Sequence, residues 1–240
     1  MAEEKINATV TKEKKSRKKE KPITVDLDKN GRHSSKFLNV LKALLLPILR
    51  LIKPFRIYGN KQVPDGAYIY ISNHYAMLDI MYPVVTTKEI VHYVAKKEVF
   101  KMPVLGWFAR CINAIGVSRD GSDVRGLLDC FKCLKNGEKI CIFPEGTRNK
   151  SKEEMLPFKH GAAVMAIKCK APIVPIVIYK KPKFFRRAHV LIGDPIELSE
   201  YYGKKLSDEE LSAIDEQLRQ RMLDMKKEHA EFLANTKKKA

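Results

Sequence analysis

The stretch Ala67-Tyr68-Ile69-Tyr70-Ile71-Ser72, followed directly by Asn73 and His74, decides the fold of this chain. It is uncharged and rich in aromatic and β-branched residues, which predicts a buried strand. Similar short runs recur downstream, and helical patterns lie between them. The runs cover 90–95, 139–143, 173–179 and 188–192, and the helical patterns cover 121–136 and 158–170. This alternation predicts an α/β domain with a mixed, largely parallel sheet flanked by helices.

A histidine and an acid follow the first strand, at the sheet edge where open α/β sheets bind ligands. His74 is suited to remove a proton from a hydroxyl, because imidazole titrates near neutral pH. Asp79 can accept a hydrogen bond from the other ring nitrogen and stabilise the imidazolium. We place His74 in the strand-to-helix turn and Asp79 in the first helical turn. Taken alone, the pattern fits a buried structural histidine equally well.

The chain has no Gly-x-Ser-x-Gly elbow that would supply a serine nucleophile. The hydroxyl that His74 activates is therefore expected to belong to the substrate.

A second motif, Phe-Pro-Glu-Gly-Thr-Arg at 143–148, follows another predicted strand. Gly146 permits a tight turn, and Arg148 offers a planar donor fork that suits phosphate. Glu145 can orient this arginine or bind a substrate hydroxyl. Lys159 adds a cation near the start of a predicted helix, where anions are favoured. We predict a phosphate clamp made by Glu145, Gly146, Thr147, Arg148 and Lys159; an ordinary turn with a surface ion pair is the alternative.

These motifs resemble those of the glycerolipid acyltransferases that acylate lysophosphatidic acid, the 1-acyl-glycerol-3-phosphate O-acyltransferases. The family's Asn-His-x-x-x-x-Asp block matches 73–79, and its Phe-Pro-Glu-Gly-Thr-Arg block matches 143–148. The segment 97–107, leading to Arg119, resembles an intermediate block, and Val174-Pro175-Ile176 matches the last one. The blocks keep the family's order over roughly residues 58–200. The chain departs from the pattern at Ser118, where the family usually has an acid or a similar polar residue.

The resemblance implies transfer of a fatty acyl group from a thioester to the free hydroxyl of lysophosphatidic acid, giving phosphatidic acid in phospholipid synthesis. It implies that His74 is the general base, that Asp79 is its partner, and that no acyl-enzyme forms. It assigns Arg119, Glu145, Gly146 and Arg148 to the glycerol-phosphate end and Pro175 to the acyl-donor region. No metal or cofactor is expected, and acyl-CoA or acyl carrier protein is the co-substrate. Another acceptor, glycerol-3-phosphate or a different lysophospholipid, is the alternative.

The charge balance points to anionic partners. The 240 residues carry 46 Lys and Arg against 28 Asp and Glu, a net charge of +18. Such a balance favours an anionic membrane surface, phosphorylated substrates or nucleic acid. No RNA-binding motif or stacking-aromatic array is found, so we expect no specific nucleic acid partner. A non-catalytic protein that binds membranes or RNA through a basic tail is the alternative of a different class.

The two ends of the chain differ from its centre. Residues 1–33 are polar and lysine-rich, with no secretory signal, and predict a disordered tail. Residues 34–57 predict an amphipathic helical segment in the membrane interface, since the longest uncharged stretch, 43–49, is too short to cross a bilayer. A helix packed on the protein's own core is the alternative. We expect a peripheral or monotopic protein on the cytoplasmic face of the cell membrane.

The acyltransferase domain is expected to cover 58–200, followed over 201–240 by a C-terminal helix and a basic end. Residues 207–210, Ser-Asp-Glu-Glu, form a predicted capping box that opens this helix. The five cysteines include Cys130-x-x-Cys133, but no second pair or nearby histidine completes a metal set. We expect reduced structural thiols on an amphipathic helix.

Overall fold

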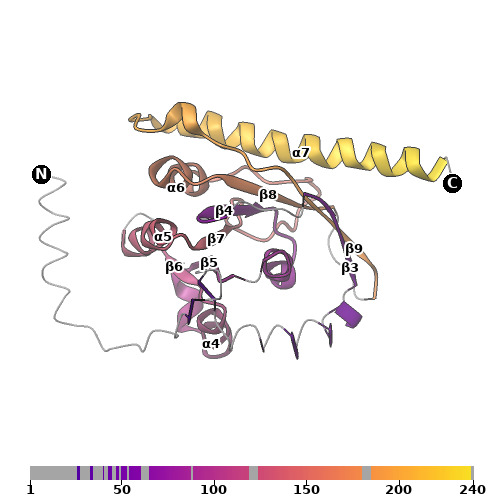
Figure 1. Cartoon of the computed structure of the whole chain (residues 1–240), viewed down its shortest axis with the longest axis horizontal. Helices are drawn as coiled ribbons and strands as arrows, with labels where there is room; N and C mark the ends of the chain where they lie inside the picture. Colours follow the sequence, from indigo (N-terminus) through magenta and orange to yellow (C-terminus); the bar gives the residue numbers. More distant parts are fainter. Residues whose placement is uncertain are drawn as a thin grey trace, which may run out of the picture.

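A seven-stranded sheet organises the computed structural model, which describes residues 26–27, 33–34, 40, 43–44, 47–48, 50–52, 54–60, 65–87, 89–118, 124–179 and 185–238 (Figure 1). The strand order is β3-β9-β8-β4-β7-β5-β6. Five neighbouring pairs are parallel, and only β8 and β9 pair antiparallel. The strands are β3 (Phe55–Gly59), β4 (Tyr68–Ser72), β5 (Val91–Lys96), β6 (Ile115–Val117), β7 (Lys139–Ile142), β8 (Ile173–Ile178) and β9 (Ala188–Ile192). The predicted mixed, largely parallel sheet is confirmed.

Helices cover both faces of this sheet. They are η1 (Met77–Ile80), α3 (Met81–Val84), η2 (Lys97–Lys101), α4 (Pro103–Cys111), α5 (Arg125–Lys135), α6 (Gly161–Cys169), η3 (Ser199–Tyr201) and α7 (Asp208–Lys238). One hydrophobic cluster joins the sheet to α5, α6 and α7, and a second joins the opposite face to α3. Figure 1 shows α5 and α6 on one side of the strands, with the long α7 crossing above them.

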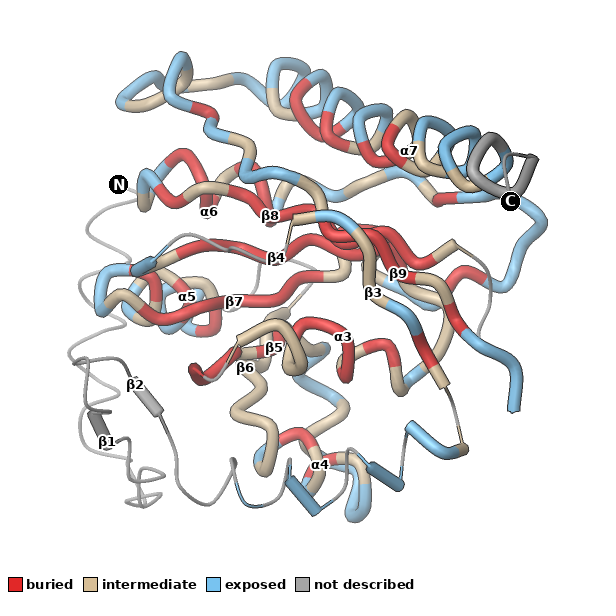
Figure 2. Tube along the Cα trace, turned by 45° about the vertical axis from the view of Figure 1, so that its right-hand side comes forward, coloured by how far each residue is buried: buried red, intermediate tan, exposed pale blue. Residues whose placement is uncertain are grey.

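The central strand β4 explains why its sequence is uncharged. Tyr68, Ile69, Tyr70 and Ile71 are all fully buried, and Figure 2 shows this strand in the interior. The isoleucines contribute to the cluster with α5, α6 and α7, whereas the tyrosines contribute to the opposite one. A strand that is buried on both faces needs an apolar side chain at every position, not an alternating pattern. This places the end of β4, and therefore His74, in the middle of the sheet edge.

The C-terminal helix begins where the capping box predicts. The Ser207 N–H donates to Glu210 Oε2 at 2.7 Å, and the Glu210 N–H donates to Ser207 Oγ at 3.2 Å. The apolar stripe of α7 is buried against the domain, including Ile214, Leu218 and Met222. This stripe fixes α7 to α6 and the sheet.

The N-terminal third differs in part from the prediction. Most of the predicted tail lies outside the described residues, but β1 (Asp26–Leu27) pairs antiparallel with β2 (His33–Ser34). The segment predicted to be helical to residue 57 instead enters strand β3 at Phe55, because β9 offers a parallel partner. Its described residues between 40 and 52 are helical. No helix among the described parts of the chain is long and apolar enough to span a bilayer.

Candidate active site

Parallel pairing brings the two sequence motifs to the same edge of the sheet. Strands β4 and β7 are neighbours, with Ile71 opposite Ile142. His74 follows the end of β4 by two residues, and Glu145 follows the end of β7 by three. Because parallel strands end at the same edge, residues distant in sequence meet there. The predicted meeting of the motifs is therefore observed.

His74 and Asp79 form the predicted pair. His74 Nδ1 lies 3.1 Å from Asp79 Oδ2, and the Asp79 side chain is fully buried. An ionised carboxylate can only accept, so Nδ1 carries the proton and Nε2 keeps its lone pair. Asp79 lies in η1, within the first helical turn after His74, as predicted. This tautomer is the one that lets Nε2 act as a base.

Main-chain groups hold the Asp79 carboxylate in place. Its Oδ2 also accepts from the N–H groups of Tyr75 and Ala76, each at 2.6 Å. These donors lie at the start of η1, where unpaired N–H groups favour a negative charge. A five-residue separation thus becomes a direct contact because the chain curls around the carboxylate.

The second motif clamps the main chain of His74 from both sides. The His74 N–H donates to Glu145 Oε1 at 2.7 Å, and the His74 carbonyl accepts from the Asn149 N–H at 2.6 Å. The other oxygen of Glu145 accepts from the Leu156 N–H at 3.0 Å. Glu145 is only 3% exposed, so these bonds are shielded from water. Glu145 therefore ties the histidine loop to the loop that follows β7.

Burial raises the pKa of the Glu145 carboxyl above its ordinary value, although the hydrogen bonds from Leu156 and His74 act in the opposite direction. The sequence prediction gave Glu145 a substrate-binding or arginine-orienting role. In this structure both of its oxygens accept main-chain hydrogen bonds, and the predicted contact with a substrate or an arginine stays a prediction. Its visible role is to position His74.

Two further residues support the base, and sequence reasoning did not assign them a role. The Phe143 ring stacks on the His74 ring with centroids 4.1 Å apart and planes 24° apart. The Asn73 amide donates to the Ile178 carbonyl at 2.9 Å and accepts from the Ile178 N–H at 2.8 Å. Asn73 thus fixes the end of β4 to β8, and Phe143 limits how the imidazole can turn. The only sequence signal for Asn73 and Phe143 was that each is the first residue of one of the two quoted motifs.

The predicted phosphate clamp is assembled in part. Gly146 has φ +65°, a left-handed conformation that favours glycine. The Lys159 N–H donates to the Pro144 carbonyl at 3.0 Å. The Lys159 side chain lies over Gly146, since a Cβ at residue 146 would be 3.1 Å from Lys159 Cδ. Thr147 and Arg148 are exposed in the same loop.

Arg119 lies outside the described residues, so its predicted role stays a prediction. Pro175 lies in β8 opposite Ile71, and its carbonyl accepts from the Gly193 N–H at 2.9 Å. The backbone polar positions of Pro175 therefore face β9, where the antiparallel pairing begins. Because the missing N–H of proline would also point to β9, the hydrogen bonds between β8 and β4 remain complete. Its link to the acyl donor is likewise untested.

The site is thus an oriented histidine base beside an exposed loop that carries an arginine and a lysine. Such a site can remove a proton from the hydroxyl of a bound, anionic substrate. Comparisons with known proteins identify the family. The family model described as Acyltransferase matches residues 54–179, which include His74, Asp79 and the whole 143–148 loop.

Individual relatives carry more specific names. The 1-acyl-sn-glycerol-3-phosphate acyltransferase of Bacillus subtilis (strain 168) is 31% identical over 186 residues, covering 74% of this chain and 91% of that protein. The protein of the same name from Helicobacter pylori is 34% identical over 124 residues, covering 50% of this chain and 52% of its own length.

A solved structure with the same fold is among the matches. The crystal structure of the 1-acyl-sn-glycerophosphate acyltransferase PlsC from Thermotoga maritima matches with a TM-score of 0.54 at 20% identity. The match covers 79% of this chain and 95% of that one. The chain belongs to the acyltransferase family.

Proposed function

We propose that this protein transfers a fatty acyl group from an acyl thioester to the free hydroxyl of lysophosphatidic acid, giving phosphatidic acid. The observation that carries the proposal is the contact between His74 Nδ1 and Asp79 Oδ2, with the His74 main chain held by Glu145. The names of the relatives support the choice of acceptor.

His74 acts as the general base. Its Nε2 takes the proton of the substrate hydroxyl while the hydroxyl oxygen attacks the thioester carbonyl carbon. The carbon–sulfur bond then breaks, and the leaving thiolate takes the proton back from the imidazolium. Asp79 stabilises the positive charge on the ring between these two steps. No protein side chain is acylated in this scheme.

The cationic loop binds the acceptor. Arg148 and Lys159 present positive charge beside Gly146, whose lack of a side chain allows a phosphate to approach the main chain. Arg119 joins the set by resemblance, and the Thr147 hydroxyl adds a donor. Holding the phosphate also sets the position of the hydroxyl, and orientation of this kind lowers a reaction barrier by several kcal/mol.

Lysophosphatidic acid is a membrane lipid. We propose that the protein binds the cytoplasmic face of the membrane peripherally. The described helical residues between 40 and 52 expose apolar side chains at helical spacing. These are Val40 (58% exposed), Leu44 (65%), Ile48 (55%) and Leu51 (77%). The net charge of +18 adds attraction to anionic head groups and to anionic acyl carriers.

An acceptor panel tests the proposed reaction. The full chain is incubated with lysophosphatidic acid, glycerol-3-phosphate or a zwitterionic lysophospholipid, each with acyl-CoA and with acyl carrier protein as donor. Mass spectrometry of the products is expected to show phosphatidic acid from the first acceptor with at least one donor. Acylation of glycerol-3-phosphate alone would contradict the proposed acceptor, and no acylation of any acceptor would contradict the reaction.

A further inference from the structure

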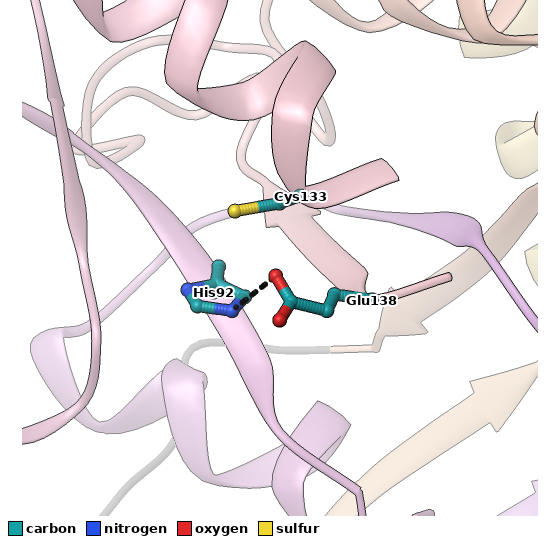
Figure 3. A group of neighbouring side chains, drawn as sticks. All are labelled: His92, Cys133 and Glu138. Carbon is teal, nitrogen blue, oxygen red and sulfur yellow. Dashed lines mark ion pairs between the residues drawn. The ribbon is translucent and has the colours of Figure 1, made fainter. Parts of the chain in front are cut away.

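A histidine, a cysteine and a glutamate converge at the opposite end of the sheet from His74 (Figure 3). His92 lies at the start of β5, Cys133 near the end of α5, and Glu138 directly before β7. The four residues of β7 separate this group from the loop that carries Glu145, roughly 13 Å at the rise of a strand. The group is therefore distinct from the proposed active site.

Hydrogen bonding leaves His92 with a lone pair aimed into the group. His92 Nδ1 lies 3.1 Å from the Asn113 carbonyl oxygen, which can only accept, so Nδ1 carries the proton of the neutral ring. Nε2 is buried and lies 3.2 Å from Glu138 Oε2, where a protonated ring forms an ion pair with the carboxylate. When the ring is neutral, both atoms are acceptors, and a bound cation would bridge them in place of the proton.

The support of His92 is the kind that metal-bound histidines use. A ligating histidine usually donates its second N–H to a main-chain carbonyl or a carboxylate, which fixes the ring. Asn113 supplies this carbonyl from the turn after α4 and has φ +53°, a conformation that asparagine tolerates better than most residues. The ring of His92 is thus oriented before any ion arrives.

The third member adds sulfur. One ligand atom from each side chain lies within 4.8 Å of the others, and the group combines one nitrogen, one sulfur and one oxygen. A metal binds the thiolate, so a bound cation would replace the proton of the Cys133 thiol and binding would release a proton.

Nitrogen, thiolate and carboxylate ligands together suit zinc. Zinc bond lengths in tetrahedral sites place ligand atoms about 3.3–3.6 Å apart. The His92–Glu138 separation of 3.2 Å is already close to this range. Since all three ligand atoms lie within 4.8 Å of one another, the sulfur has to approach by little more than 1 Å.

We infer that His92, Cys133 and Glu138 form a zinc site that joins β5, α5 and the turn before β7. Three protein ligands leave the fourth tetrahedral position to water. The ion would add a link between α5 and the paired strands β5 and β7, and its role would be to stabilise the fold. The sequence prediction sought a partner near Cys133 in the chain, whereas His92 comes from a distant strand.

Metal titration of the tag-free full chain tests the site. The protein is treated with a chelator, titrated with Zn²⁺ or Co²⁺, and examined by mass spectrometric metal content and by absorption spectroscopy. We expect one ion per chain and a thiolate-to-cobalt charge-transfer band. The Cys133→Ala variant is expected to lose this band and to bind zinc at least tenfold more weakly. His92→Ala and Glu138→Gln are expected to weaken zinc binding similarly.

The neighbouring thiol provides a matched control. Cys130 lies one turn earlier on α5 and is fully buried in the core, so Cys130→Ala should keep both the ion and the cobalt band. Circular dichroism establishes that each variant is folded. Failure of the wild-type chain to take up about one zinc would overturn the inference, independently of the variants. Equal zinc affinity in wild type and folded Cys133→Ala would overturn it as well.

Discussion

The substitution Asp79→Asn isolates the charge that stands beside the proposed base. The amide oxygen can still accept from the Tyr75 and Ala76 N–H groups and from His74 Nδ1, which all meet at Oδ2 in the wild type. The start of η1 and the histidine tautomer should therefore survive. What disappears is the negative charge that stabilises the imidazolium.

The size of the effect follows from the distance. Unit charges 3.1 Å apart attract by about 5 kcal/mol at an effective dielectric constant of 20. Since each 1.36 kcal/mol changes a rate about tenfold, full proton transfer in the transition state predicts a loss of roughly 10,000-fold in kcat. If half of the charge has developed on the ring, the loss is roughly 100-fold. The KM for lysophosphatidic acid should change by less than about threefold, because the lost charge acts mainly on the imidazolium, which forms only during turnover.

The assay is steady-state release of the donor thiol at saturating acyl thioester, with lysophosphatidic acid varied. A second aspartate offers a matched control: Asp215 Oδ2 lies 2.7 Å from His160 Nδ1, and Asp215 is almost fully buried. Asp215→Asn makes the same chemical change to a pair formed by His160, the residue before α6, and Asp215 on α7, and should leave kcat within about threefold. Folded Asp79→Asn with a kcat similar to that of wild type, or a defect confined to KM, would refute the reasoning.

Three further changes probe other parts of the account. Burial raises the pKa of Glu145 above 4.5, so the folded chain binds the carboxyl proton more tightly than the unfolded chain. The contribution of Glu145 to folding stability therefore falls as pH rises from 4.5 through the raised pKa. Urea unfolding should then show wild type losing stability relative to Glu145→Gln over this range, and a parallel pH dependence would argue against the burial effect. Gly146→Ala should destabilise the fold by about 1 kcal/mol through its positive φ and raise the KM for the acceptor by displacing Lys159, as measured by thermal unfolding and kinetics. Removal of residues 1–33 should keep turnover of dispersed substrate and reduce co-sedimentation with anionic vesicles. Absence of turnover in the full chain, together with loss of vesicle binding in the shortened chain, would favour a non-catalytic protein that binds through its tail.

The sequence predicted the central strands because burial on both faces leaves an uncharged run with few alternatives. Strand β4 is the clearest case, since Tyr68 to Ile71 are fully buried. Strand β3 was missed because its exposed positions include Arg56 and because only the distant β9 provides its partner. Strand β6 is only three residues long and partly buried, which gives no periodic signal.

In the candidate site, too, local contacts were predictable from the sequence, and contacts with distant segments were not. The His74–Asp79 contact was predictable because one turn of local chain brings the two side chains together. The role of Glu145 in holding His74 could not be predicted from the sequence. Its partners are the main-chain N–H groups of His74 and Leu156, and nearly every residue type offers such a group. The stacking of Phe143 on His74 was likewise hidden, since it depends on the pairing of β4 with β7.

In the proposed reaction, His74 removes the proton from a substrate hydroxyl. The turnover number of the His74→Ala variant, with saturating lysophosphatidic acid and acyl thioester, tests this role most directly. General-base catalysis predicts a kcat about 100- to 10,000-fold below that of wild type in a protein that remains folded. A folded His74→Ala variant that forms phosphatidic acid at a near-normal rate would contradict it.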